Sequence, residues 1–148
     1  VQTIHQNITG FGPPPTDEEI PELDAKVDRI LKEKLKDYNL ELDGKPKIKV
    51  DIPDSNLMMF KVRYRIEQEL RRIWIKNIDN IENRKKPLTI IIRELTDNRI
   101  IDKQLYYILR EVLSVCNYAI HGEKVSQNQV DFVEKNAEEI IDFLSRME

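Results

Sequence analysis

The spacing of apolar and polar residues divides the chain into an N-terminal third with little regularity and a longer part with helical periodicity. Residues 1–22 show no sustained period and carry five prolines or glycines from Gly10 to Pro15, so we expect an extended arm or linker. In residues 23–38 apolar side chains recur every three or four positions, which predicts a short amphipathic helix. Its apolar positions are Val27, Ile30, Leu31 and Leu35.

The stretch NLELDGKPKIKVDIP, residues 39–53, alternates apolar and polar residues on both sides of a turn signal. Asp43 and Gly44 separate Leu40 and Leu42 from a second apolar set, which consists of Ile48, Val50 and Ile52. Alternation around an Asp-Gly pair predicts a small β-hairpin or an extended pair. Together with the preceding helix, this stretch forms a second region, residues 23–53.

Residues 54–148 have the pattern of four helices, and the first of these is long. Asp54 or Ser55 can cap its N-terminus, and the helix fades in the polar tract NIDNIENRKK, residues 77–86. Pro87 suits the first turn of the next helix, a short apolar one predicted for residues 88–95. The apolar positions of the long helix are Met59, Val62, Ile66, Leu70, Ile73 and Trp74.

A third helix is predicted for residues 101–121, with Gly122 as the left-handed residue beyond its end. Ser126, with Gln129 three positions later, has the pattern of a capping box for the last helix. The apolar face of that helix consists of Val130, Val133, Ala137, Ile140, Ile141 and Leu144. We therefore expect a mainly α fold, in which an up-and-down four-helix bundle follows the N-terminal helix.

Composition narrows the function classes and the compartment. The chain of 148 residues has a net charge of −3, which speaks against a general polyanion binder but allows a local basic patch. A single cysteine excludes an internal disulfide and suits a reducing compartment, so a cytoplasmic location is expected. No apolar run approaches the roughly 18 residues of a membrane span, and histidines or cysteines at metal-binding spacing are lacking. We expect no membrane contact, metal or cofactor for this segment, and further domains before Val1.

One side of the third helix carries a polar stripe. At 100° per residue, Arg110, Ser114, Asn117 and His121 gather within about 60°. Such a stripe is either solvated surface or one wall of a site or interface, and a histidine in the last turn also interacts favourably with the helix dipole. The apolar arc on the other side consists of Leu105, Ile108, Leu109, Val112, Leu113, Val115, Cys116, Ala119 and Ile120.

Two short motifs give the helical part a family resemblance. The long helix contains R-x-E-x-x-L at residues 65–70, and the third helix ends in C-N-Y-A-I-H-G at residues 116–122. With the order of the helices, these motifs resemble the HEPN superfamily (higher eukaryotes and prokaryotes nucleotide-binding domains), in particular an uncharacterised bacterial branch with an R-N-x-A-x-H-G helix end. The resemblance covers about residues 51–147. It implies an up-and-down helical bundle that usually forms dimers, and its active members are metal-independent ribonucleases.

This chain departs from the family motif at one position. Cys116 replaces the arginine that, with the histidine, acts on the phosphodiester in active members, and a neutral thiol supplies no fixed positive charge. The favoured hypothesis is an intracellular binding or dimerisation module without catalysis, which forms part of a larger bacterial defence or stress protein. The expected oligomeric state is a homodimer, and RNA or a nucleotide is a further expected ligand. The alternative is a toxin-like, metal-independent RNA endonuclease, with His121 as acid or base and Asn117 as the orienting group.

A set of basic residues provides a candidate surface for nucleic acid. Arg65, Arg72 and Lys76 lie along the long helix, where they either follow a phosphate backbone or form a solvated face interleaved with acidic residues. Arg110 shares the polar stripe with His121, but about 16 Å along the helix axis separates the two within one subunit. In an antiparallel dimer, a partner's arginine would come closer.

Overall fold

The computed structural model describes residues 12–41, 51–78 and 86–148. The chain divides into two units, Val1–Asp51 and Ile52–Glu148. The regular elements of the described ranges are all helices: α2 (Ile20–Asp37), α3 (Asp54–Asn77), α4 (Leu88–Asp97), α5 (Lys103–Ile120) and α6 (Gln127–Arg146). The predicted mainly α fold is confirmed. The turn of the predicted hairpin and most of its residues lie outside the described residues.

Within the described residues of the first unit, the regular element is helix α2, which is amphipathic. It begins at Ile20, three residues before the predicted start, with Pro21 in its first turn, where the missing N–H costs nothing. It ends at Asp37 with Tyr38 as the C-cap, and beyond it the φ of 54° at Asn39 allows the N–H of Leu40 to bond to the carbonyl of Leu35 at 2.8 Å. None of its residues is buried: Leu35 is half-buried, and its other large apolar side chains are exposed.

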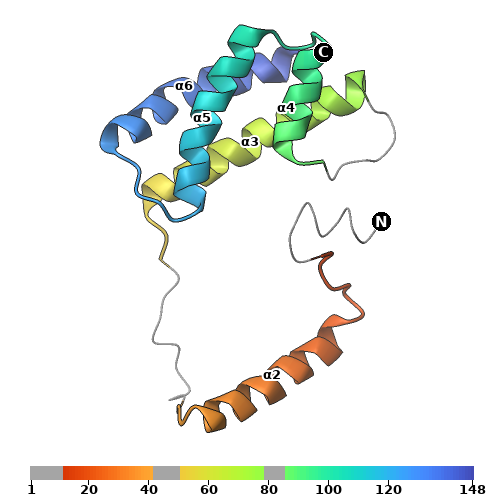
Figure 1. Ribbon diagram of the computed structural model, residues 1–148, viewed down its shortest axis with the longest axis vertical. Coiled ribbons are helices and arrows are strands. Elements are labelled where there is room, and N and C mark those ends of the chain that lie inside the picture. The colour runs from red at the N-terminus through yellow and green to blue at the C-terminus, as the bar shows by residue number, and fades with distance from the viewer. Residues whose placement is uncertain (1–11, 42–50, 79–85) are drawn as a thin grey trace. The chain divides into compact units, whose positions relative to one another are not determined.

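The second unit is a bundle of four helices built around α3. This helix contacts α4, α5 and α6, and α5 also contacts both α4 and α6 (Figure 1). Short α4 packs beside the C-terminal part of α3. The N-terminal part of α3 lies against the C-terminal part of α5, because Asn56 contacts Ala119 and Met59 contacts Cys116. The two long neighbours therefore run antiparallel.

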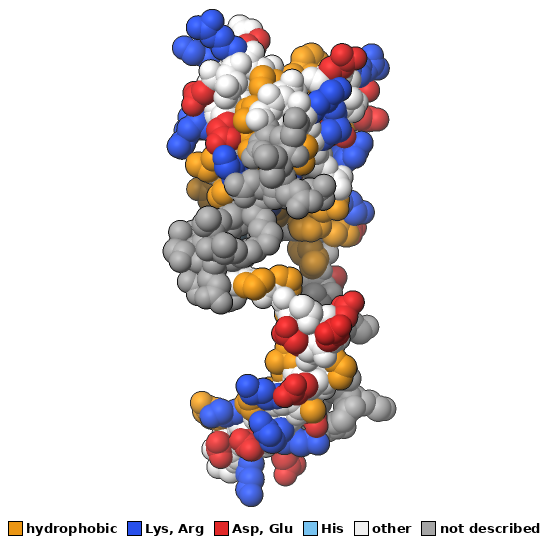
Figure 2. All heavy atoms as spheres, turned by 90° about the vertical axis from the view of Figure 1, so that its right-hand side faces the viewer, with side chains coloured by type: hydrophobic (Ala, Val, Ile, Leu, Met, Phe, Trp, Pro, Cys, Tyr) orange, Lys and Arg blue, Asp and Glu red, His pale blue; other side chains and the backbone are white. Residues whose placement is uncertain are grey.

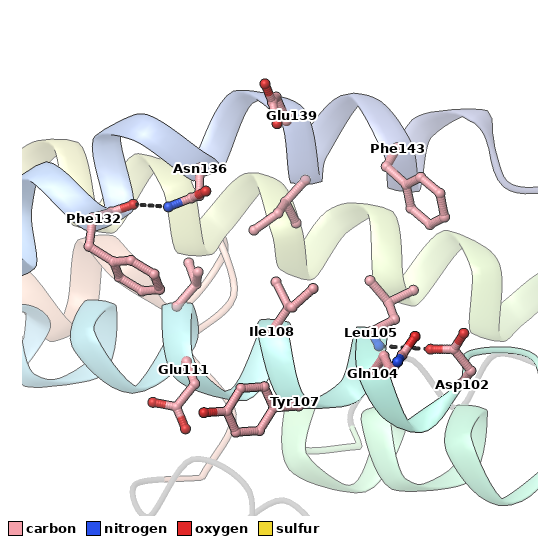
Figure 3. Close-up of a pocket in the computed structure, with 12 residues that line it drawn as sticks. Asp102, Gln104, Leu105, Tyr107, Ile108, Glu111, Phe132, Asn136, Glu139 and Phe143 are labelled. Atoms are coloured by element: carbon pink, nitrogen blue, oxygen red, sulfur yellow. Dashed lines mark hydrogen bonds between the residues drawn. The ribbon is translucent and has the colours of Figure 1, made fainter.

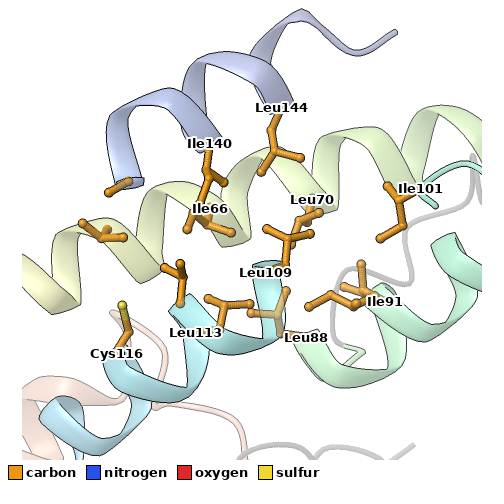
Figure 4. Close-up of a cluster of buried hydrophobic side chains, with 14 of the residues drawn as sticks. Ile66, Leu70, Leu88, Ile91, Ile101, Leu109, Leu113, Cys116, Ile140 and Leu144 are labelled. Carbon is orange, nitrogen blue, oxygen red and sulfur yellow. The ribbon is translucent and has the colours of Figure 1, made fainter. Parts of the chain in front are cut away.

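The core of the bundle is formed by aliphatic side chains from all four helices (Figure 4). Every apolar position predicted for the long helix is buried, and so are most of those predicted for the last one. In α6 the two exceptions, Val130 and Ile141, are half-buried at the edge of the core. Burying this much apolar surface is the main stabilising contribution to the bundle, at roughly 25 cal/mol per Å². The buried side chains from α6 are Val133, Ala137, Ile140 and Leu144.

The N-caps of α3 and α4 differ from the predicted ones. Helix α3 is preceded by Pro53 as its N-cap, with no side-chain cap, so the prediction that Asp54 or Ser55 caps it is wrong. Pro53 already has extended backbone angles, and its carbonyl accepts the N–H of Leu57 at 3.0 Å. Pro87 likewise precedes α4 as N-cap and does not lie within its first turn. A proline with ψ near 140° thus sets the start of both helices.

The other caps are made by side chains. Asp102 caps α5, since its carboxylate accepts the N–H of Leu105 at 2.8 Å. The predicted capping box of α6 is confirmed, with the hydroxyl of Ser126 accepting the N–H of Gln129 at 3.1 Å and the Gln129 side chain accepting the N–H of Ser126 at 2.8 Å. These bonds satisfy N–H groups that have no partner within their own helix.

A polar group of three side chains ties α4 to the end of α3. The indole of Trp74 donates a hydrogen bond to Glu94 at 2.6 Å, and Lys86 donates to the same carboxylate at 2.7 Å. The ammonium of Lys86 also lies 5.2 Å from the centre of the Trp74 ring. The hydrogen bonds from Lys86 and Trp74 hold the pKa of the Glu94 carboxyl below its usual value. Trp74 is therefore held both by packing in the core and by the hydrogen bond of its indole N–H.

Candidate functional site

The predicted catalytic residues Asn117 and His121 lie at the carboxyl end of α5. His121 is the C-cap residue, and its backbone N–H bonds to the carbonyl of Asn117 at 3.1 Å. Gly122 follows with φ of 79°, which confirms the predicted left-handed residue beyond the helix. Both side chains are exposed, and within the described part of the chain neither forms a hydrogen bond or an ion pair. Their polar groups face solvent side by side, one turn apart.

The helix end below them is fixed by α3. Asn56 donates a side-chain hydrogen bond to the carbonyl of Ala119 at 2.9 Å. This bond satisfies one of the last carbonyls of α5, which have no partner within the helix. Asn56 carries no sequence signal for this role, because its partner lies 63 positions later in the chain. The C-terminal turn of α5 is thus held in a defined position, which a site at this end requires.

Cys116 lies in the core directly beneath this turn. Its side chain is 0% exposed, and its Sγ lies 4.0 Å from Sδ of Met59. The predicted place of Cys116 in the apolar arc is confirmed. Burial raises the pKa of the Cys116 thiol to about 11, and the nearby positive charge of Arg63 opposes that increase only in part. The thiol is therefore neutral near pH 7 and supplies neither a cation nor a thiolate.

Arg63 is a cation close to the motif that sequence reasoning did not single out. It extends from α3, its charge acts on Cys116, and its Nη1 lies 3.7 Å from Oε2 of Glu67. Its Nε is buried without a hydrogen-bond partner in the described structure. Glu67 is shared, because it also accepts two hydrogen bonds from Arg71, at 2.7 and 3.1 Å. The spacing of four residues between these side chains indicates ion pairs on one helix face, which the sequence alone could suggest. The sequence could not show that this face lies near Cys116, because that depends on how α3 packs against α5.

The helix itself adds an electrostatic effect at this end. Aligned peptide dipoles give the carboxyl end of a helix about half a negative charge. His121 and Asn117 therefore lie where a cation is favoured and a phosphate anion is disfavoured. In the described structure no hydrogen bond or ion pair brings an arginine or lysine to the His121 ring. An anion would need a positive charge from elsewhere to bind here.

Two of the three arginines predicted to bind nucleic acid, Arg65 and Arg72, have structural contacts. Glu69 is 6% exposed, forms an ion pair with Arg65 at 3.1 Å and accepts a hydrogen bond from Arg72 at 2.9 Å. Arg72 also donates to the carbonyls of Leu144 and Met147, at 2.9 and 3.0 Å. This guanidinium therefore joins α3 to the C-terminal end of α6.

The remaining two predicted basic residues, Lys76 and Arg110, are exposed. Lys76 lies in the last turn of α3, and Arg110 lies on α5, where about 16 Å of helix separates it from His121. On the face of the molecule in Figure 2, lysines and arginines alternate with acidic side chains. The structure does not gather the predicted basic residues around His121.

A groove between α5 and α6 is a second candidate site, and it contains none of the predicted residues. Its volume is about 650 Å³. Apolar side chains of both helices point into it, and carboxylates lie at its margins (Figure 3). The residues that line this groove, called the α5–α6 groove below, are Asp102, Gln104, Leu105, Tyr107, Ile108, Glu111, Val112, Phe132, Asn136, Glu139, Ile140 and Phe143.

Comparisons with known proteins gave no match to a family model, to a curated protein or to a solved structure. The described residues hold no group of three or more histidine, cysteine or acidic side chains placed to bind a metal ion. None of the described helices has both the length and the hydropathy needed to cross a bilayer.

Proposed function

We propose that the bundle, about residues 51–147, is a HEPN-like module that acts by binding and dimerisation, without catalysis, in the cytoplasm and within a larger bacterial defence or stress protein. The observation that carries this proposal is the buried, neutral Cys116 beneath the His121 turn. Phosphodiester cleavage by an imidazole needs a cation to hold the phosphate. In this chain the position of the family arginine belongs to the core, and the helix end is electrostatically unfavourable for phosphate.

The proposed homodimer has a candidate contact surface on α3. Leu57, Phe60 and Tyr64 are exposed and lie at positions i, i+3 and i+7, so they form one apolar face, called the α3 face below. The rings of Phe60 and Tyr64 are stacked, with centroids 6.3 Å apart, and Gln68 donates to the Tyr64 hydroxyl at 3.1 Å. Ordered, exposed aromatic side chains are typical of protein interfaces. Two copies pairing along this face would cover it.

The dimer is tested by removing this aromatic pair. We expect the wild-type chain to sediment as a dimer at micromolar concentration and the double variant Phe60→Ser, Tyr64→Ser to dissociate at least about tenfold more readily. Both rings are more than half exposed, so the melting temperature should change little. Tyr118→Ser removes an equally exposed ring on α5 and is the matched control. A wild-type chain that stays monomeric, or a dimer that survives in the double variant, would exclude this surface.

The absence of catalysis is tested at His121. We expect no RNA cleavage above background by the purified chain in the presence of a chelator, and no change in His121→Ala. The substitution should cost about 0.3–1 kcal/mol of stability through the lost interaction with the helix end. A cleavage activity that survives chelation and falls a hundredfold or more in folded His121→Ala would contradict the proposal and establish a ribonuclease.

The second candidate function is the metal-independent RNA endonuclease, with His121 as acid or base and Asn117 as the orienting group. One observation favours it: Arg63 brings a positive charge from α3 toward the position of the missing family arginine. If His121→Ala abolishes a cleavage activity, Arg63→Gln should abolish it as well. Arg63 would then be the cation that completes the site.

A further inference from the structure

We propose that the α5–α6 groove binds an amphipathic helix of a partner protein, one whose apolar side chains are flanked by lysines or arginines. This binding goes beyond the proposed homodimer, which uses the α3 face. The partner is defined by three properties of the groove: its length, the apolar side chains that it exposes and the sign of its charges.

The length of the groove matches a helix. Its lining residues extend over eleven residues from Asp102, the N-cap of α5, to Val112, and over twelve residues of α6, from Phe132 to Phe143. At 1.5 Å per residue, each wall is about 15–16 Å long, which equals about three turns of a helix. The volume of about 650 Å³ is therefore spread along a trough between two helices. A segment of three turns fills such a trough from end to end.

The apolar side chains are spaced for helical anchors. Phe132 and Phe143 lie on the same side of α6 about three turns apart, and Ile108 of α5 points between them (Figure 3). Phe143 is 55% exposed and Ile108 is 43% exposed, although both point into the groove. An amphipathic helix that presents apolar residues at i, i+4, i+7 and i+11 extends over about 16 Å, so its outer side chains reach the levels of Phe132 and Phe143 and its inner ones the level of Ile108. Covering them would remove exposed apolar surface from water.

The charges of the groove are all negative. The charged residues that line it are Asp102, Glu111 and Glu139, from both walls. Asp102 is occupied as the N-cap of α5, whereas Glu111 and Glu139 form no ion pair within the described residues. The nearby bases Arg110 and Lys135 are not among the residues that line the groove. The groove therefore favours a helix with basic flanks and repels the phosphates of a nucleic acid.

The test uses two synthetic 18-residue helical peptides with the same leucine positions, one with lysine flanks and the other with glutamate flanks. Titrated into the full chain, the lysine peptide should bind at least about tenfold more tightly, with an affinity that falls as salt is added. The double variant Glu111→Lys, Glu139→Lys should reverse the preference. The single variants Ile108→Ser and Phe143→Ser should each weaken the binding of the lysine peptide. The variant Phe60→Ser, on the α3 face, should leave that binding unchanged.

Several results would overturn the proposal: equal binding of both peptides, no binding of either, or a preference that survives the charge reversal. A loss of peptide binding in Phe60→Ser would assign the peptide to the α3 face. Dissociation of the homodimer by Phe143→Ser would show that a second copy occupies the groove. If the chain forms the dimer but does not bind the peptide, only the proposal for the groove is overturned. If the chain is monomeric and binds the lysine peptide, the proposed dimer is overturned and the proposal for the groove stands.

Discussion

The variant Cys116→Arg is expected to unfold the four-helix bundle, with a loss of more than about 4 kcal/mol. Cys116 is 0% exposed, and Met59 of α3 lies against it, so a guanidinium has no space there without separating α3 from α5. The new charge would also lie near the like charge of Arg63. Small domains are stable by only about 5–15 kcal/mol, so a loss of this size removes much of the native population.

Circular dichroism during heating or urea unfolding measures this effect. Cys116→Ala keeps the position small and neutral and is the matched control, with an expected loss of about 1–2 kcal/mol. A Cys116→Arg variant that melts like the wild type would contradict the prediction and show that the guanidinium reaches solvent. If that variant also cleaved RNA in a chelator, Asn117 and His121 would still be arranged for the family chemistry.

The second large effect is expected at Glu69, where Glu69→Ala should destabilise the bundle by about 3 kcal/mol. The carboxylate is almost completely buried and lies between Arg65 and Arg72. Without it, the partly buried guanidinium of Arg72 loses the partner that directs it to the carbonyls of Leu144 and Met147, and no negative charge remains between it and the exposed Arg65. Equilibrium urea unfolding, followed by circular dichroism, gives the free energy.

Glu67→Ala is the matched control, because Glu67 lies two positions earlier on α3 and also contacts arginines, but is about a quarter exposed. Its loss should be about 1 kcal/mol or less, since water still reaches these partly exposed groups and replaces much of their pairing. A double-mutant cycle of Glu69→Ala with Arg72→Met isolates the coupling of the pair. Equal losses of stability in Glu67→Ala and Glu69→Ala would contradict the prediction, because they would show that burial of the Glu69 carboxylate adds nothing to its contribution.

Features of the fold that depend on residues close together in the sequence could be predicted from the sequence. Apolar spacing of 3.6 residues identified the buried face of α3 and placed Cys116 in the core. Gly122 and the Ser126 capping box were predicted because their signals lie within four residues. The wrong prediction that Asp54 or Ser55 caps α3 also has a local cause. Pro53 is the N-cap and fixes the start of the helix, so neither side chain acts as a cap.

The candidate sites were harder to predict, because their geometry depends on residues far apart in the sequence. Arg72 looked like a phosphate-binding side chain, yet its carbonyl partners lie more than 70 positions later. The role of Arg63 beside Cys116 requires the register of α3 against α5. Phe132 and Phe143 form a groove only because α6 packs beside α5 at one particular rotation. Helical periodicity predicts which face of a helix is buried, but not which partner it meets.

The setting of Trp74 also makes the protein convenient for studying how the bundle comes apart. The chain has one tryptophan and one cysteine, and both are buried in the same core. Indole emission is sensitive to the carboxylate and the ammonium at its edge, so it reports separation of α4 from α3. Thiol labelling of Cys116 reports the other end of α3, about 22 Å away at Met59. Two natural probes on one helix thus show, without any added label, whether both ends of the bundle open in a single cooperative step.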